Sequence, residues 1–219
     1  MIREFIHRLA TTKVAKDAKN PWDFSRKENE IRRKNLGGYF DAMAKLKPSI
    51  LLIGEAPGYR GCGRVGMPFS SEKLILSHPF FSDKAVFDIE NKDLPIAEAS
   101  ATIVWKTFDS LRFYPLMWAT YPFHPHKLGN PLSNRAPRPD EIVLGEIFIE
   151  ELIRIFKIKH LVAVGRIAEK TLTDMGHKSY PVRHPSHGGA TLFAEGLKSY
   201  AKAIKKTAPK SFKTKVKSR

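Results

Sequence analysis

Four short apolar runs alternate with longer helix-like segments, and this alternation restricts the fold more than any other feature. A turn-forming glycine or proline lies at the end of each run, which is typical of buried strands. Such an order predicts an α/β fold in which helices cover both faces of a parallel sheet. The runs are SILLIGE (49–55), PLMWATYP (115–122), KHLVAVG (159–165) and SYPVRHP (179–185).

The segments between the runs carry helical patterns. PDEIVLGEIFIEELIRIFK (139–157) begins with two carboxylates, which the positive end of a helix dipole favours. GRIAEKTLTDMG (165–176) has a glycine at each end, and residues 28–46 and 97–112 form two more helical candidates. The apolar residues of the 139–157 segment that fall close to one helix face are Ile142, Leu144, Phe148, Leu152 and Phe156.

The chain is strongly basic, with a formal net charge of +16 over 219 residues. This length favours one domain, which we place at residues 1–197, followed by a basic and flexible tail at 198–219. The tail holds nine basic residues and no acidic one, and removing them leaves +7 on the domain. We therefore expect an acidic polymer such as DNA as the partner, because the tail lacks the apolar face that membrane insertion needs.

Nothing in the sequence predicts a membrane protein or a secreted one. No apolar run approaches the roughly 20 residues needed to span a bilayer, and charged residues interrupt the apolar part of the N-terminus. The single cysteine, Cys62, excludes an intrachain disulfide and a cysteine-ligated cluster held by this chain alone. We expect a cytoplasmic, soluble monomer.

Glu55 follows the first apolar run inside LLIGEAPGYRGCG (51–63). A carboxylate at the end of a buried strand can orient a water molecule or stabilise developing positive charge. The surrounding glycines let a ligand approach the backbone closely. Alternatively, Glu55 caps a helix or pairs with an arginine. A phosphate-binding loop is a weaker interpretation, because the segment lacks the Gly-Lys-Ser/Thr ending of a P-loop.

Two further motifs could carry chemistry. In GMPFSSE (66–72), Phe69 follows a proline and could stack on a nucleobase, or simply belong to the core, and Ser70 or Ser71 can cap a helix. In RHPSHGGA (183–190), His184 could donate a hydrogen bond to a ligand oxygen. A metal site is a weaker interpretation. His184 and His187 are spaced for a metal, as are His124 and His126, but neither pair has partner cysteines or carboxylates.

PFHPHKLGNPLSNRAPRPDE (122–141) is rich in proline and contains Asn130, Asn134 and Arg135. It is either a loop that faces nucleic acid or a rigid connector, and the sequence does not decide between them. Because ligands bind beyond the carboxyl ends of parallel strands, we expect this loop, GEAPG and RHPSHGG to gather at one edge of the sheet.

In this order, the motifs resemble those of the uracil-DNA glycosylase superfamily. GEAPG followed by GMPF is similar to its first motif in the branch that uses a glutamate, and HPSHGG is similar to its second. The resemblance covers roughly residues 35–197. It implies a three-layer α/β/α sandwich around a four-stranded parallel sheet, and hydrolysis of an N-glycosidic bond in DNA after the target nucleotide is flipped out.

The resemblance also implies roles for individual residues. Phe69 would stack on the base, with Ala56 and Ala119 beside it. Glu55 would position water or stabilise the sugar cation, and His184 would donate to the leaving base. Leu192 or Phe193 could fill the gap in the helix, and no cofactor or metal is required. The residues expected to contact the DNA backbone are Pro57, Gly58, Arg60, Ser186, His187, Gly188 and Gly189.

The chain departs from the family pattern in two ways. Many members of the glutamate branch hold an iron–sulphur cluster with four cysteines, which this chain cannot provide. In the closest pattern, an asparagine that reads uracil follows a tryptophan, and here Ala119 stands in its place. Alanine cannot make those contacts and leaves more room. The favoured substrate is therefore a modified pyrimidine, such as a 5-substituted cytosine of phage DNA removed in antiviral defence. The alternatives are uracil removal in base excision repair, or a catalytically silent DNA-binding module.

Overall fold

The computed structural model describes residues 1–207 and has a central sheet of four parallel strands, in the order β3–β2–β5–β6. Each strand lies within one of the four apolar runs, so the predicted strands are confirmed. In register, Gly54 pairs with Ala119, so β2 and β3 end side by side. The strands are β2 (Ile50–Gly54), β3 (Leu116–Ala119), β5 (His160–Val164) and β6 (Ser179–Val182).

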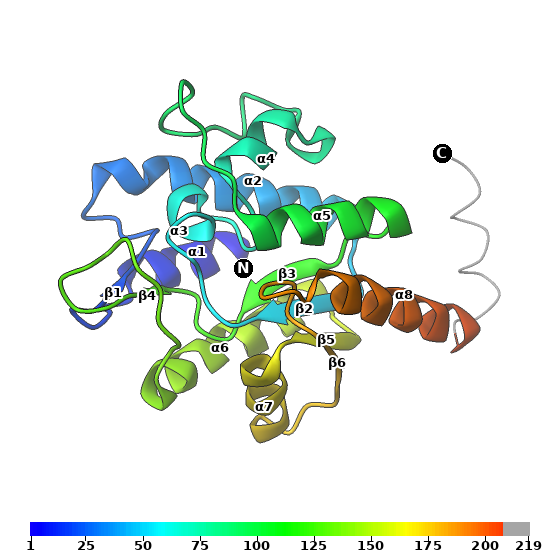
Figure 1. The fold of residues 1–219 in the computed structure, drawn as a ribbon. Coiled ribbons are helices and arrows are strands. Elements are labelled where there is room, and N and C mark those ends of the chain that lie inside the picture. The colour runs from blue at the N-terminus through cyan, green and yellow to red at the C-terminus, as the bar shows by residue number, and fades with distance from the viewer. Residues whose placement is uncertain (208–219) are drawn as a thin grey trace.

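Helices cover both faces of this sheet (Figure 1). The crossover from β2 to β3 contains α5 (Ala99–Leu111), whereas α6 (Pro139–Phe156) and α7 (Arg166–Asp174) carry the chain from β3 through β5 to β6 and lie on the opposite side in Figure 1. Helix α8 (Ala190–Thr207) packs against α5 and β6. The predicted α/β/α sandwich is therefore confirmed.

The edge formed by β3 is covered by the N-terminal helices α1 (Ile2–Thr11) and α2 (Glu30–Leu46). The Met117 N–H of this edge strand donates to the Tyr39 hydroxyl of α2 at 2.7 Å, so the buried amide is paired. Phe5 of α1 packs edge-on against Trp118 with 5.4 Å between ring centroids. These contacts hold the end of β3, where Ala119 lies, in a rigid aromatic core.

The segment after β3 is braced by a small antiparallel pair, β1 (Ala18–Lys19) with β4 (His124–Pro125), and by ion pairs. Arg135 contacts the Glu141 carboxylate at 2.6 Å, and Arg138 contacts Asp17 at the same distance. The Arg138 hydrogen bond lowers the pKa of Asp17 to about 2, so this pair stays charged well below neutral pH. The segment is therefore tied both to the start of α6 and to the N-terminal region.

Short helical turns complete the described chain. Ser71 caps α4 by accepting from the Leu74 N–H at 3.5 Å, which confirms the predicted serine cap. Within residues 1–207, no helix is long and apolar enough to cross a membrane. The short elements are η1 (Lys27–Asn29), α3 (Cys62–Val65), α4 (Glu72–Ser77) and η2 (Pro79–Phe81).

The predicted boundary between domain and tail is wrong in its position. Helix α8 continues through Lys198 to Thr207, so residues 198–207 are helical rather than part of a flexible tail. The physical reason is amphipathicity, because Phe193, Leu197 and Tyr200 are buried at helical spacing while Lys198 and Lys202 are exposed. The rest of the predicted tail, 208–219, lies outside the described residues.

Candidate active site

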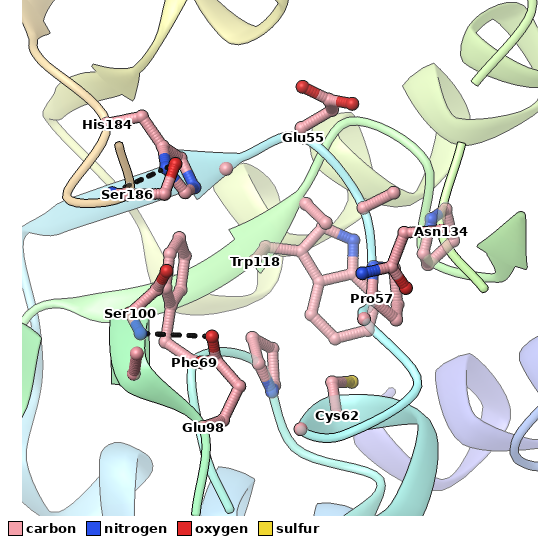
Figure 2. Close-up of a pocket in the computed structure, with 18 of the residues that line it drawn as sticks. Glu55, Pro57, Cys62, Phe69, Glu98, Ser100, Trp118, Asn134, His184 and Ser186 are labelled. Atoms are coloured by element: carbon pink, nitrogen blue, oxygen red, sulfur yellow. Dashed lines mark hydrogen bonds between the residues drawn. The ribbon is translucent and has the colours of Figure 1, made fainter. Parts of the chain in front are cut away.

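The carboxyl ends of β2 and β3 and the loop after β6 meet at one cavity of about 470 Å³. Glu55, Phe69 and His184 line it (Figure 2), and so does Ala119. Residues more than 100 positions apart in the sequence thus share one site. We expected this, because the carboxyl ends of parallel strands lie at the same edge of the sheet.

Glu55 is held by its backbone while its carboxylate stays free. Its carbonyl accepts from the Thr120 hydroxyl at 2.6 Å and from the Tyr121 N–H at 3.1 Å, which joins the ends of β2 and β3. Within the described residues, the carboxylate has no hydrogen-bond or ion-pair partner. Burial raises the pKa of this half-buried carboxyl. Within the described residues, Glu55 therefore neither caps a helix nor pairs with an arginine, and both alternative interpretations are excluded there.

His124 stabilises the loop that follows Glu55. Its Nδ1 lies 2.8 Å from the Pro57 carbonyl oxygen, and its Nε2 lies 3.2 Å from that of Pro131. Burial lowers the pKa of His124, which favours a neutral ring that donates to one of these carbonyls at a time. Within residues 1–207, no three His, Cys, Asp or Glu side chains lie close enough together to hold a metal ion. His124 is thus a structural link between the two loops.

Phe69 sits against the backbone at the end of β2. Its own backbone is left-handed (φ 47°), and its carbonyl accepts from the Trp105 indole N–H at 2.8 Å. A Cβ added to Gly54 would lie 2.5 Å from Cζ of the Phe69 ring. The ring can therefore reach this position only because residue 54 has no side chain.

Gly54→Ala should move the Phe69 ring out of the cavity wall and reduce the base release that the motif resemblance implies by about 10- to 100-fold, because small misplacements of a binding group are costly. The fold should survive, since the clash meets only the tip of one side chain. Base release and the circular dichroism spectrum of the variant should be measured together. Gly37→Ala is the matched control, because its added Cβ would lie 3.8 Å from Ile6, an ordinary contact. Wild-type activity in Gly54→Ala would contradict a role for the ring position.

His184 faces the cavity with a defined tautomer. Its Nδ1 accepts from the Ser186 backbone N–H at 3.2 Å and lies 2.7 Å from the Ser186 hydroxyl. A backbone amide can only donate, so the proton of the neutral ring lies on Nε2. Burial, with Arg183 and His187 nearby, lowers the pKa of His184 and favours this neutral form.

Two expectations about this loop change. The Ser186 hydroxyl donates to His184 Nδ1, so it is not free to donate to a phosphate while it holds the ring. Phe193 is fully buried and cannot fill a gap in DNA, whereas Leu192 is 57% exposed. The chain turns sharply here, with His187 and Gly188 both in left-handed conformation.

The other residues expected to contact DNA lie in or beside the cavity. Ala56, Pro57, Gly58 and His187 line it, and the Ala56 and Gly58 N–H groups have no partner within the described chain. Arg60, Gly188 and Gly189 do not line it, although Arg60 directly precedes the lining residue Gly61, and Gly188 and Gly189 come one and two positions after the lining residue His187. Sequence analysis did not single out the lining residues Trp22, Glu98 and Ser100, which belong to no motif.

The loops around the cavity are rich in basic residues, although the carboxylates Glu55 and Glu98 line the cavity itself. The segments that follow β2 and β3, 56–71 and 120–138, and the segment from β6 onward, 179–194, contain no Asp or Glu. Arg60, Lys127 and Arg183 are exposed there, and no carboxylate partner for them exists within residues 1–207. The cavity therefore opens on a surface that suits a polyanion.

A parallel α/β sandwich with this cavity at its strand ends defines the class of protein, and comparisons with known proteins identify the family. Residues 40–207 match the family described as the uracil DNA glycosylase superfamily. The chain therefore belongs to this superfamily, and the resemblance of its motifs is confirmed.

The structure is similar to the crystal structure of wild-type Pedobacter heparinus SMUG2. The TM-score is 0.61 at 16% sequence identity, over 94% of this chain and 97% of that chain. A likeness at this identity shows the shared fold. No curated protein sequence matches the chain.

Proposed function

We propose that this protein is a monofunctional DNA glycosylase that removes a flipped pyrimidine by hydrolysing its N-glycosidic bond. The observation that carries the proposal is the convergence of Glu55, Phe69 and His184 on one cavity with a basic rim. A free carboxylate, an aromatic ring and a neutral imidazole donor are the groups that this reaction needs. Within the described residues 1–207, no lysine lines the cavity, so none of their side-chain amines is placed to form a Schiff base with the sugar.

In the proposed reaction, the bond between sugar C1′ and the base nitrogen breaks, and its electron pair leaves with the base. The Nε2–H of His184 donates to an oxygen of the departing base and stabilises its negative charge. The Glu55 carboxylate stabilises the positive sugar and orients the water whose oxygen adds to C1′. That water loses a proton, the base gains one, and an abasic site remains.

For the substrate, we favour a pyrimidine with a bulky 5-substituent, such as a modified cytosine of phage DNA. Ala119 supports this choice, because its methyl group lines the cavity at the end of β3 and can neither donate nor accept. Plain uracil is the second candidate, which backbone groups such as the free Ala56 N–H could recognise. The third candidate, a silent DNA-binding module, is less consistent with a free carboxylate that is costly to keep half-buried.

The experiment that tests the proposal is a base-release assay on matched DNAs. They would carry uracil, unmodified cytosine, 5-hydroxymethylcytosine or glucosylated cytosine, each scored for alkali-labile abasic sites. Release from a modified cytosine alone supports the favoured substrate, and release from uracil supports repair. Tight binding without abasic sites on any of these DNAs would contradict the enzymatic proposal.

Ala119→Asn should shift the preference toward uracil by about 10-fold or more, because a paired donor and acceptor at this position can discriminate strongly between base edges. The longer side chain should also exclude large 5-substituents and so reduce their release. The measurement is the ratio of kcat/KM for uracil to kcat/KM for the modified base. Ala119→Val adds bulk without polarity and serves as the control. An unchanged ratio in both variants would contradict base reading at this position.

A further inference from the structure

Two leucines stand exposed on a short loop beside the cavity, which we term the 127–133 loop (Lys127–Ser133). Leu128 is 76% exposed and Leu132 is 69% exposed. Neither contributes to the core, although each could bury a large apolar area against a partner. The loop is therefore a candidate contact surface.

The loop holds these leucines rigidly. The Asn130 N–H donates to the Lys127 carbonyl at 2.9 Å, and the Asn130 side-chain oxygen accepts from the Leu132 N–H at 3.2 Å. The Ser133 hydroxyl closes the loop, because it accepts from the Lys127 N–H at 2.9 Å and donates to the Asn130 carbonyl at 2.7 Å. A preorganised loop loses little conformational entropy when it binds, which favours insertion into a partner.

The 127–133 loop is also tied to the loop that follows Glu55. His124 contacts the carbonyls of Pro57 and Pro131, one in each loop. The Asn134 side chain, which lines the cavity directly after the 127–133 loop, accepts from the Tyr59 N–H at 3.1 Å. The leucines are thus presented in a fixed relation to Glu55.

Charge identifies the partner class. Residues 120–138 contain no carboxylate, and Lys127 is exposed without an acidic partner in the described chain. Arg60, which follows the Tyr59 that is hydrogen-bonded to Asn134, is likewise exposed. An apolar tip inside a basic surface suits DNA, in which anionic phosphates flank an apolar base stack.

We propose that the 127–133 loop inserts Leu128 and Leu132 into duplex DNA beside the flipped nucleotide. The leucines would occupy space that the extruded base leaves and would offset part of the cost of unstacking, which is a few kcal/mol. The inference rests on the proposed function, since it assumes that a base is flipped into the cavity. It adds a second apolar element to the exposed Leu192 of α8, on a loop that belongs to neither family motif.

The test compares Leu128→Ser/Leu132→Ser with the wild type on duplex and single-stranded DNA carrying the same target base. On duplex DNA, kcat/KM should fall about 10-fold or more, because the variant must unstack the helix without apolar compensation. The loss on single-stranded DNA should be at least about fivefold smaller, because no base stack has to be opened. Val143→Ser/Ile147→Ser is the matched control, since these residues of α6 are 62% and 48% exposed and lie outside the cavity lining.

A binding measurement keeps the inference separate from catalysis. A duplex with a stable tetrahydrofuran abasic analogue next to 2-aminopurine should fluoresce more strongly when the wild type binds, and the double variant should lose this signal. A signal that persists in the double variant, or that the wild type never gives, would overturn the inference. If the wild type releases no base from any DNA, the proposed function fails, and the fluorescence change still reports on the loop. The leucines could instead pack against a second copy of the chain. Sedimentation would then show a dimer that the double variant loses, while the fluorescence signal with DNA stays unchanged. That result would also overturn the inference.

Discussion

Glu55→Gln should lower the rate of base release by about 10²- to 10⁴-fold, the range expected for a group that assists proton transfer or stabilises charge in the transition state. Glutamine keeps the shape of the side chain and removes its negative charge. Affinity for substrate DNA should change by no more than a few fold, because the proposed role places the carboxylate at the sugar and the water rather than at a phosphate. Single-turnover kinetics and fluorescence anisotropy would measure the two effects separately.

The control for this change is Glu169→Gln, which neutralises an exposed carboxylate on α7. Base release at the wild-type rate in Glu55→Gln would contradict the proposed mechanism. Equal loss of rate and DNA affinity would instead indicate that the variant has lost its binding surface rather than a catalytic group.

The same residue couples activity to pH and stability. Burial raises the pKa of Glu55, so the ionised form that the reaction needs is lost at a higher pH than for an ordinary glutamate. Stability follows the opposite sign, because a raised pKa in the folded state stabilises the fold below the unfolded value of about 4.3 and loses that contribution as pH rises. Glu55→Gln should therefore have a higher Tm than the wild type at about pH 7.5, with the difference shrinking toward about pH 4.

His184→Ala should reduce base release by about 10²- to 10³-fold, as removal of one preorganised donor to a developing oxyanion does in other enzymes. Nε2–H is the donor in the neutral ring, and the lowered pKa of His184 keeps the ring neutral at and above its usual titration range. The rate should therefore show no loss as the pH rises through about 6.5. The measurement is the pH profile of kcat for the wild type beside the rate of the variant at neutral pH.

His184→Gln restores a neutral N–H donor and should recover part of the lost rate, which a merely structural role would not predict. His160→Ala is the matched control, because it removes an exposed imidazole at the opposite end of the sheet. If the wild type lost activity as the pH rose above the pKa of His184, the reaction would require the protonated ring. That result would contradict the role of His184 as a neutral donor.

Much of this molecule follows from local sequence patterns. The runs that became β2, β3 and β5 are short and almost fully buried, as strands of a covered parallel sheet are, whereas β6 at the sheet edge is only partly buried. The 139–157 segment begins and ends in the structure within one residue of its prediction, because Pro139 and the acidic first turn are strong helix-start signals. The α8 boundary failed because the count of lysines obscured the buried spacing of Phe193, Leu197 and Tyr200.

The residues of the candidate site likewise include some that the sequence could predict and some that it could not. Glu55, Phe69 and His184 could be singled out from the sequence because each lies in a short motif, and those of Glu55 and His184 directly follow a strand. Trp22, Glu98 and Ser100 could not, since each reaches the cavity through packing between distant segments. Nor could sequence spacing show that the Phe69 ring depends on Gly54, or that His124 joins the loop after Glu55 to the 127–133 loop.

By itself, the sequence determined the fold class, the family and the residue types available for chemistry, because periodicity and short motifs are properties of neighbouring residues. The tertiary structure decided the hydrogen bonding, the protonation and the exposure of these residues. It left the Glu55 carboxylate without a partner, set the tautomer of His184 through the Ser186 N–H, and exposed Leu128 and Leu132 beside the cavity. These are consequences of burial and of contacts between segments far apart in the chain, and the free energies of a charge or a proton depend on those surroundings.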